Sequence, residues 1–191
     1  MCLVLAAARP SAATAATIGV LHFDPHHTVV AFHLSGTLHE THGTFPLTEG
    51  TLAVDPASGA ATGRVVVDAT GGESSNDMRD ARMSSVVLQS ARFPTIEFRP
   101  ARVDGHRRAD GSFHATLHGE LTLHGAAHAL DVDVEGRLVG DQLTATARFV
   151  VPYVAWGLED PSVLLLTVAK EVEIDVTTTG NLTWTNDEEK R

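Results

Sequence analysis

Strict alternation of apolar and polar residues constrains this chain more than any other sequence feature. From Phe113 to Leu123, every second residue is apolar or a glycine and the residues between are mostly polar. Period-two alternation turns one face of a strand to a core and the other to water, as in antiparallel sheets. The same pattern recurs in the ranges 130–138, 143–149 and 172–176. Turn signals such as Asp110-Gly111 separate these runs, so the sequence predicts eight or nine short strands in an all-β fold.

Residues 75–89 depart from this pattern, because Met78, Ala81, Ser85 and Leu88 recur at helical spacing. A serine or asparagine at positions 74–76 can cap the N-terminus of such a helix. We therefore predict an antiparallel eight-stranded barrel of the lipocalin-like kind, with one short helix at about 75–89 near a barrel mouth.

The ends of the chain differ in composition from its middle. Residues 1–17 combine a short apolar stretch with the small-residue pattern Ala13-Thr14-Ala15, which suggests the remnant of a signal peptide or a disordered N-terminus. We expect a periplasmic or secreted protein, with the barrel domain at 18–179 and a polar C-terminal tail at 180–191.

Charge and cysteine content exclude several classes of function. The formal net charge of -10 repels phosphate backbones and anionic headgroups, so we expect no nucleic-acid partner. No run of about 18 apolar residues occurs, so stable membrane insertion is not expected. Cys2 is the single cysteine and cannot form an internal disulfide. The oligomeric state stays open, with a homodimer as one option.

The predicted inner wall of the barrel is apolar but rich in small residues. An eight-stranded barrel is either filled by its side chains or holds one small ligand. Small residues are compatible with a narrow dry core. They are also compatible with a cavity that holds an elongated apolar ligand. An empty apolar cavity would lose dispersion contacts, and such a ligand would restore them. The small inward candidates are Ala31, Gly36, Ala53, Ala69, Ala115, Gly119, Gly136, Ala145 and Ala147. The larger apolar candidates for the lumen are Val30, Phe32, Leu34, Phe45, Leu52, Val67, Met78, Met83, Leu88, Phe93, Ile96, Phe98, Leu117, Leu121, Phe149 and Trp156.

Three short motifs follow one another in the chain: Arg-Asp-Ala-Arg-Met at 79–83, Phe-Pro-Thr-Ile-Glu-Phe at 93–98 and Gly-Glu-Leu-Thr-Leu-His-Gly at 119–125. They resemble the R-D-x-H-L, F-P-x-I-x-F and G-x-L-T-L-H-G motifs of the YceI-like family, and weaker matches extend over about 20–178. The resemblance implies a barrel that binds a polyisoprenoid, such as a prenylated quinone-type lipid, with no catalytic residues and no other cofactor. Arg82 and Met83 replace the family's His-Leu, which leaves the lipid and its headgroup contact open.

Two other functions compete with lipid binding. The chain has 11 histidines, which invites the hypothesis of a histidine-dependent metal hydrolase. However, no His-x-His occurs, and His39-Glu40-Thr41-His42 is one residue short of the H-E-x-x-H motif, so we predict no metal site unless distant histidines meet across strands. The other alternative is a ligand-free interaction or stress-associated protein with a filled barrel. Arg79 is the polar candidate at the rim, either tying the helix to the barrel or contacting a lipid headgroup.

Overall fold

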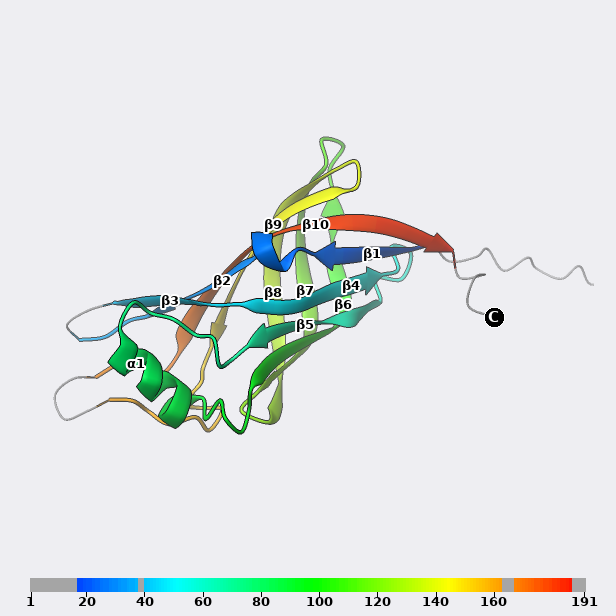
Figure 1. Cartoon of the computed structure of the whole chain (residues 1–191). Coiled ribbons are helices and arrows are strands. Elements are labelled where there is room, and N and C mark those ends of the chain that lie inside the picture. The colour runs from blue at the N-terminus through cyan, green and yellow to red at the C-terminus, as the bar shows by residue number, and fades with distance from the viewer. Residues whose placement is uncertain (1–16, 38–39, 163–166, 187–191) are drawn as a thin grey trace, which may run out of the picture.

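The computed structural model describes residues 17–37, 40–162 and 167–186, and they form ten strands, one 3-10 turn and one longer helical segment (Figure 1). The prediction for residues 1–16 lies outside this part of the chain. Among the described residues, no helix has the length and apolar character needed to cross a membrane. The strands are β1 (Thr17–Phe23), β2 (Val29–Leu34), β3 (Thr41–Phe45), β4 (Leu47–Val54), β5 (Ala61–Asp68), β6 (Thr95–Arg107), β7 (Ser112–Leu123), β8 (Ala126–Val139), β9 (Gln142–Val151) and β10 (Val172–Asn186).

The ten strands form one antiparallel sheet that closes on itself. Their order is β1-β4-β5-β6-β7-β8-β9-β10-β2-β3, and an additional pairing of β1 with β10 completes the ring. β1 and β2 pair with the same edge of β10, β1 along residues 180–186 and β2 along 173–177. β1 and β2 therefore act as one long, interrupted strand, and β3 and β4 act as another. Counted in this way the ten strands make eight, and the predicted closed eight-stranded barrel is confirmed.

Both interruptions have a local cause. A single 3-10 turn, Pro25–His27, separates β1 from β2, and the Asp24 carboxylate caps it by accepting a hydrogen bond from the His26 amide at 2.9 Å. Proline is favoured at the first position of such a turn because its missing N–H would have no partner there. Pro46 separates β3 from β4, where it cannot donate to the ladder. These breaks divide each of the two long strands into two parts.

The prediction of a polar tail at 180–191 is wrong for its first seven residues. Residues 180–186 belong to β10 and pair with β1, from Phe23↔Gly180 to Thr17↔Asn186. In the sequence, a glycine at position 180 suggests the end of a strand. In the structure the strand continues through Gly180, where a Cβ would lie only 2.7 Å from the carbonyl oxygen of His22. The glycine therefore permits a close approach of two strands.

The predicted helix is confirmed and has two parts. α1 (Asp77–Arg82) is capped by Asn76, whose side-chain oxygen accepts a hydrogen bond from the Arg79 amide at 3.0 Å. It continues as a π-helical turn, Met83–Val87, in which the Leu88 amide donates to the carbonyl of Met83. In Figure 1 the helix lies at one end of the barrel, beside the arm formed by β2 and β3. We refer to this end as the mouth.

Candidate functional site: an apolar cavity inside the barrel

A cavity of about 580 Å³ occupies the barrel interior. It extends from Val132, Leu143 and Ala145 on the strands to Met83 and Val87 in the helical segment. Its lining is almost entirely apolar, and its size lies within the ~300–1,000 Å³ typical of small-molecule sites. A barrel with this interior is not completely filled by its own side chains.

Most of the apolar residues predicted for the lumen border this cavity. Alternation works here because each strand turns every second side chain inward. The predicted residues found on the cavity wall are Val30, Phe32, Leu34, Phe45, Leu52, Val67, Met83, Leu88, Ile96, Phe98, Leu117, Leu121 and Phe149.

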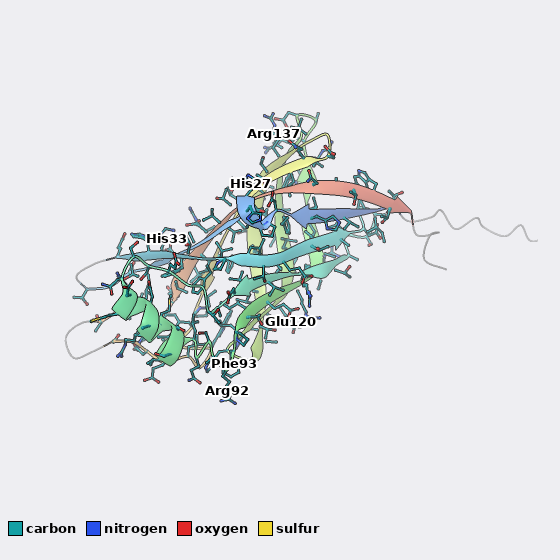
Figure 2. The ribbon with its side chains drawn as sticks, in the orientation of Figure 1. His27, His33, Arg92, Phe93, Glu120 and Arg137 are labelled. Atoms are coloured by element: carbon teal, nitrogen blue, oxygen red, sulfur yellow. The ribbon has the colours of Figure 1, made fainter. Side chains whose placement is uncertain are left out.

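Three predicted lumen residues do not border the cavity. Met78 is 83% exposed on the outside of α1. Phe93 packs against His124, with 4.4 Å between ring centroids, near the turn between β7 and β8 (Figure 2). Trp156 stacks on His128 at 4.1 Å, in a turn where strand alternation no longer applies. The prediction that these three residues line the cavity is wrong. All three lie outside the regular strands, where alternation does not tell which way a side chain points.

The error at Met78 is one of helical phase. The side chains that border the cavity from the helical segment are Arg79, Arg82, Met83 and Val87. Their spacing of three and four residues is that of one helix face, and Met78 is turned about 100° from Arg79. The long aliphatic stems of two arginines take apolar positions while their charged heads reach polar surroundings.

The small residues of the barrel do not all leave empty space. Ala115, Ala145 and Ala147 border the cavity. A Cβ at Gly119 would lie 2.8 Å from the ring of Phe98, and one at Gly136 would lie 2.6 Å from the ring of Phe113. Phenylalanine rings therefore occupy the space above these two glycines.

Two other alanines face the opposite way from the prediction. Ala31 and Ala53 do not border the cavity, whereas their neighbours Val30, Phe32, Leu52 and Val54 do. Since successive side chains of a strand alternate between its faces, both alanines point outward. Only part of the predicted small-residue wall contributes to the open interior.

A turn segment that alternation could not reveal closes one side of the cavity. Tyr153, Leu158 and Pro161 line it, and the Tyr153 hydroxyl donates a hydrogen bond of 2.7 Å to the carbonyl of Ala169. Burial, aided by the charge of Asp160, raises the pKa of Tyr153 to about 12, so the phenol is neutral at physiological pH. The prediction also omitted lining residues that follow the alternation of their strands and could have been found by extending it. Examples are Leu21, Phe23, Val54, Val65, Val103, Val172, Ile174 and Val176.

Arg79 joins the helix to the rim and also borders the cavity. Its Nε donates to Ser74 Oγ and its Nη1 to Thr41 Oγ1, each at 2.9 Å. Asp80 accepts hydrogen bonds from the hydroxyl and the backbone amide of Ser74. These bonds, with the nearby Arg79 charge, hold the pKa of the Asp80 carboxyl below its usual value. The structural role predicted for Arg79 is thus present in the geometry.

The chemistry available inside the cavity is the burial of hydrocarbon. Among its few polar lining groups, the hydroxyls of Thr28 and Thr178 hydrogen-bond to each other at 2.7 Å. In the described part of the chain, no group of three or more His, Cys, Asp or Glu side chains is placed to hold a metal ion. Two histidines, His33 and His42, do meet across strands outside the barrel.

Comparison with known proteins agrees with this architecture. The model of the YceI-like domain family matches residues 21–180. A polyisoprenoid binding domain from Saccharophagus degradans, implicated in plant cell wall breakdown, superposes with a TM-score of 0.64 at 14% identity, covering 85% of this chain and 98% of that one. Burkholderia cenocepacia BcnA superposes with a TM-score of 0.64 at 19% identity, covering 82% and 98% of the two chains. These likenesses show a shared fold. The comparison with curated proteins gave no match.

Proposed function

The chain belongs to the YceI-like domain family, and from this membership and its apolar cavity we propose that it binds one long apolar lipid inside the barrel. The ligand we propose is a polyisoprenoid or a prenylated quinone-type molecule. The cavity carries this proposal, because its walls offer hydrocarbon contacts along the length of the barrel. The structural relative from Saccharophagus degradans, a polyisoprenoid binding domain, supports the same class of ligand.

Hydrophobic burial is sufficient to drive such binding. Each CH₂ group removed from water contributes roughly 0.8 kcal/mol, so ten buried groups contribute about 8 kcal/mol. That free energy corresponds to a dissociation constant of about 1 μM before the ordering of the chain is counted. A prenyl tail also restores the dispersion contacts that an empty apolar cavity lacks. Binding therefore needs few polar contacts, in agreement with the lining.

We place the polar end of the lipid at the mouth, beside Arg79 and Arg82. Both side chains border the cavity, and Arg82 is exposed to solvent. A guanidinium donates hydrogen bonds in a planar fork, which suits carbonyl, hydroxyl or phosphate oxygens. Arg79 is held in place by Ser74 and Thr41, so it needs little ordering when a ligand arrives.

Native extraction tests the proposal. Protein purified without detergent should release a prenyl-chain lipid into organic solvent, to be identified by mass spectrometry. The variant Ala147→Trp places an indole ring in the cavity, takes space from the ligand and should reduce the amount of this lipid. Ala129→Trp is the matched control, since Ala129 lies on β8 with its side chain outside the cavity. The proposal is wrong if the native protein yields no lipid and the lipid-free protein does not take up a prenyl alcohol saturably.

We propose a periplasmic or secreted location for this binding, as the sequence of residues 1–17 suggests. Cell fractionation with antibody detection tests it, and retention of the full-length protein in the cytoplasm would contradict it. Storage and transport differ in whether the lipid leaves the barrel. Transfer of a labelled prenyl lipid from loaded protein to vesicles on a biological timescale would favour transport.

A further inference from the structure

Two histidines face each other on the outer side of the barrel wall near the mouth. His33 on β2 and His42 on β3 are directly opposite in the strand register, and their Nδ1 atoms are 2.6 Å apart. Their neighbours Phe32 and Leu34 border the cavity, so alternation turns His33 to the outer face. Figure 2 shows His33 on the arm of β2 and β3. The pair is therefore separate from the lipid cavity.

The second nitrogen of each ring is next to a carboxylate. His33 Nε2 lies 3.2 Å from Asp175 Oδ2, and His42 Nε2 lies 3.5 Å from Glu40 Oε2. Asp175 is itself held by Arg148, whose Nε lies 2.5 Å from Asp175 Oδ1. An ionised carboxylate accepts hydrogen bonds and donates none, so each contact favours the tautomer with hydrogen on Nε2.

With both rings in this tautomer, each Nδ1 carries a lone pair and faces the Nδ1 of the other ring. Two acceptors at 2.6 Å repel unless a cation lies between them. A metal ion bound by both nitrogens removes this repulsion. A histidine that binds a metal through one nitrogen and donates its other N–H to a carboxylate is the usual arrangement at protein metal sites. Each ring of this pair has a carboxylate oxygen beside the nitrogen that would stay free of the metal, 3.2 Å from His33 Nε2 and 3.5 Å from His42 Nε2.

We propose that His33 and His42 form a binding site for a divalent transition-metal ion, with the two Nδ1 atoms as protein ligands and water in the remaining positions. Neutral imidazole suits zinc, copper and nickel, and copper(II) binds most tightly in the general order of affinities. Tetrahedral coordination at about 2.0–2.1 Å needs the two nitrogens to separate to about 3.3 Å. The side chains are 38% and 56% exposed, so the rings have room to make this shift.

A second histidine pair supplies a matched control. His106 on β6 and His114 on β7 are also directly opposite each other in register. Among the described residues, neither of these two rings has a side-chain hydrogen bond or an ion pair with a carboxylate. Each double variant removes two histidines, so the two variants have the same total number of histidines. Of the two pairs, only His33 and His42 have rings next to carboxylates, so this pair is expected to bind the metal more tightly.

The test uses the full-length chain with Cys2→Ser, which removes the single thiol. Zinc chloride is titrated by calorimetry, and copper(II) chloride is followed by electron paramagnetic resonance. We expect one tight zinc site per chain and a copper spectrum split by two nitrogens. The double variant His33→Ala/His42→Ala should lose both, while His106→Ala/His114→Ala should retain both. Glu40→Gln should weaken zinc binding by about tenfold or more, the effect expected of a residue that orients a ligand.

Each outcome decides the proposal. It is overturned if His33→Ala/His42→Ala binds zinc as tightly as the unchanged chain, or if both double variants lose affinity equally. Two-nitrogen splitting that persists without His33 and His42 also overturns it. Circular dichroism checks the fold of each variant, and His42→Ala alone decides the matter if the double variant does not fold. The result is independent of lipid extraction, so this site and the proposed lipid binding can fail separately.

Discussion

Replacing Ala147 by leucine tests directly whether the barrel interior is open. Ala147 lies on β9, directly opposite Val134 of β8 and Val176 of β10, and all three side chains border the cavity. Ala147 is only partly buried, although it points into the barrel, because it faces the cavity. A longer side chain can enter this space without displacing its neighbours.

The expected gain in stability follows from the added carbons. Three carbons buried at about 0.8 kcal/mol each contribute about 2.4 kcal/mol. Fixing the leucine rotamer costs about 0.5–1 kcal/mol, so the free energy of unfolding of the lipid-free protein should rise by about 1.5–2 kcal/mol. In a chain of this length the melting temperature then rises by about 3–8 °C. Lipid affinity should fall, because the leucine takes volume from the ligand.

Urea denaturation of lipid-free protein measures the first effect, and titration with a prenyl alcohol measures the second. Ala129→Leu, on the outer face of β8, is the control and should change stability by less than about 0.5 kcal/mol. The sign of the change is decisive. In a close-packed interior the same substitution overpacks the core and destabilises it by about 1–3 kcal/mol. A loss of that size at Ala147 would refute the open cavity.

Three further predictions concern polar groups. Arg79→Met should lower the free energy of unfolding by about 1–3 kcal/mol in urea denaturation, because it removes charged hydrogen bonds between the helix and the rim. Tyr153 is the chain's single tyrosine, and its phenolate absorbance should appear with a midpoint near pH 12. Because the folded state retains the proton longer, stability should decline as the pH rises above about 10, the unfolded pKa of tyrosine. The hydrogen bond from His118 to Asp131, with the charges of Asp131 and Asp104, raises the pKa of His118. Its contribution to stability is full below about pH 6.5 and is lost as the pH rises through the raised pKa, and Asp131→Asn should lower that pKa in an NMR titration.

The strands and most of the cavity wall were predictable because a strand has only two faces. Once Phe149 is placed inside, the positions of Ala147 and Ala145 follow from the same alternation. The motif at 93–98 shows the limit of this reasoning. Ile96 and Phe98 belong to β6 and border the cavity, whereas Phe93 precedes the strand and packs outside. The boundary of the strand, which sequence reasoning locates poorly, decided which prediction was right.

The remaining features depend on contacts that no local pattern contains. A helix, unlike a strand, can turn any of several faces toward the cavity. The apolar pattern predicted that Met78 would face it, whereas the structure places Arg79 there. Tyr153 is positioned by a hydrogen bond to a residue 16 positions away. His33 and His42 meet because β2 and β3 pair in one particular register. Such pairings are set by the closed ring as a whole.

The ring closes through β1 and β10, which pair Thr17 with Asn186. These partners are 169 positions apart in the chain, so the seam cannot form on the ribosome until residue 186 has been synthesised. Contacts of such long sequence separation slow folding, because the entropy of closing a long loop is lost before the contacts form. Until then β1 and β10 each present an unpaired edge that can join another molecule. We expect the nascent chain to depend on chaperones during this interval, and truncation before residue 180 to yield aggregates.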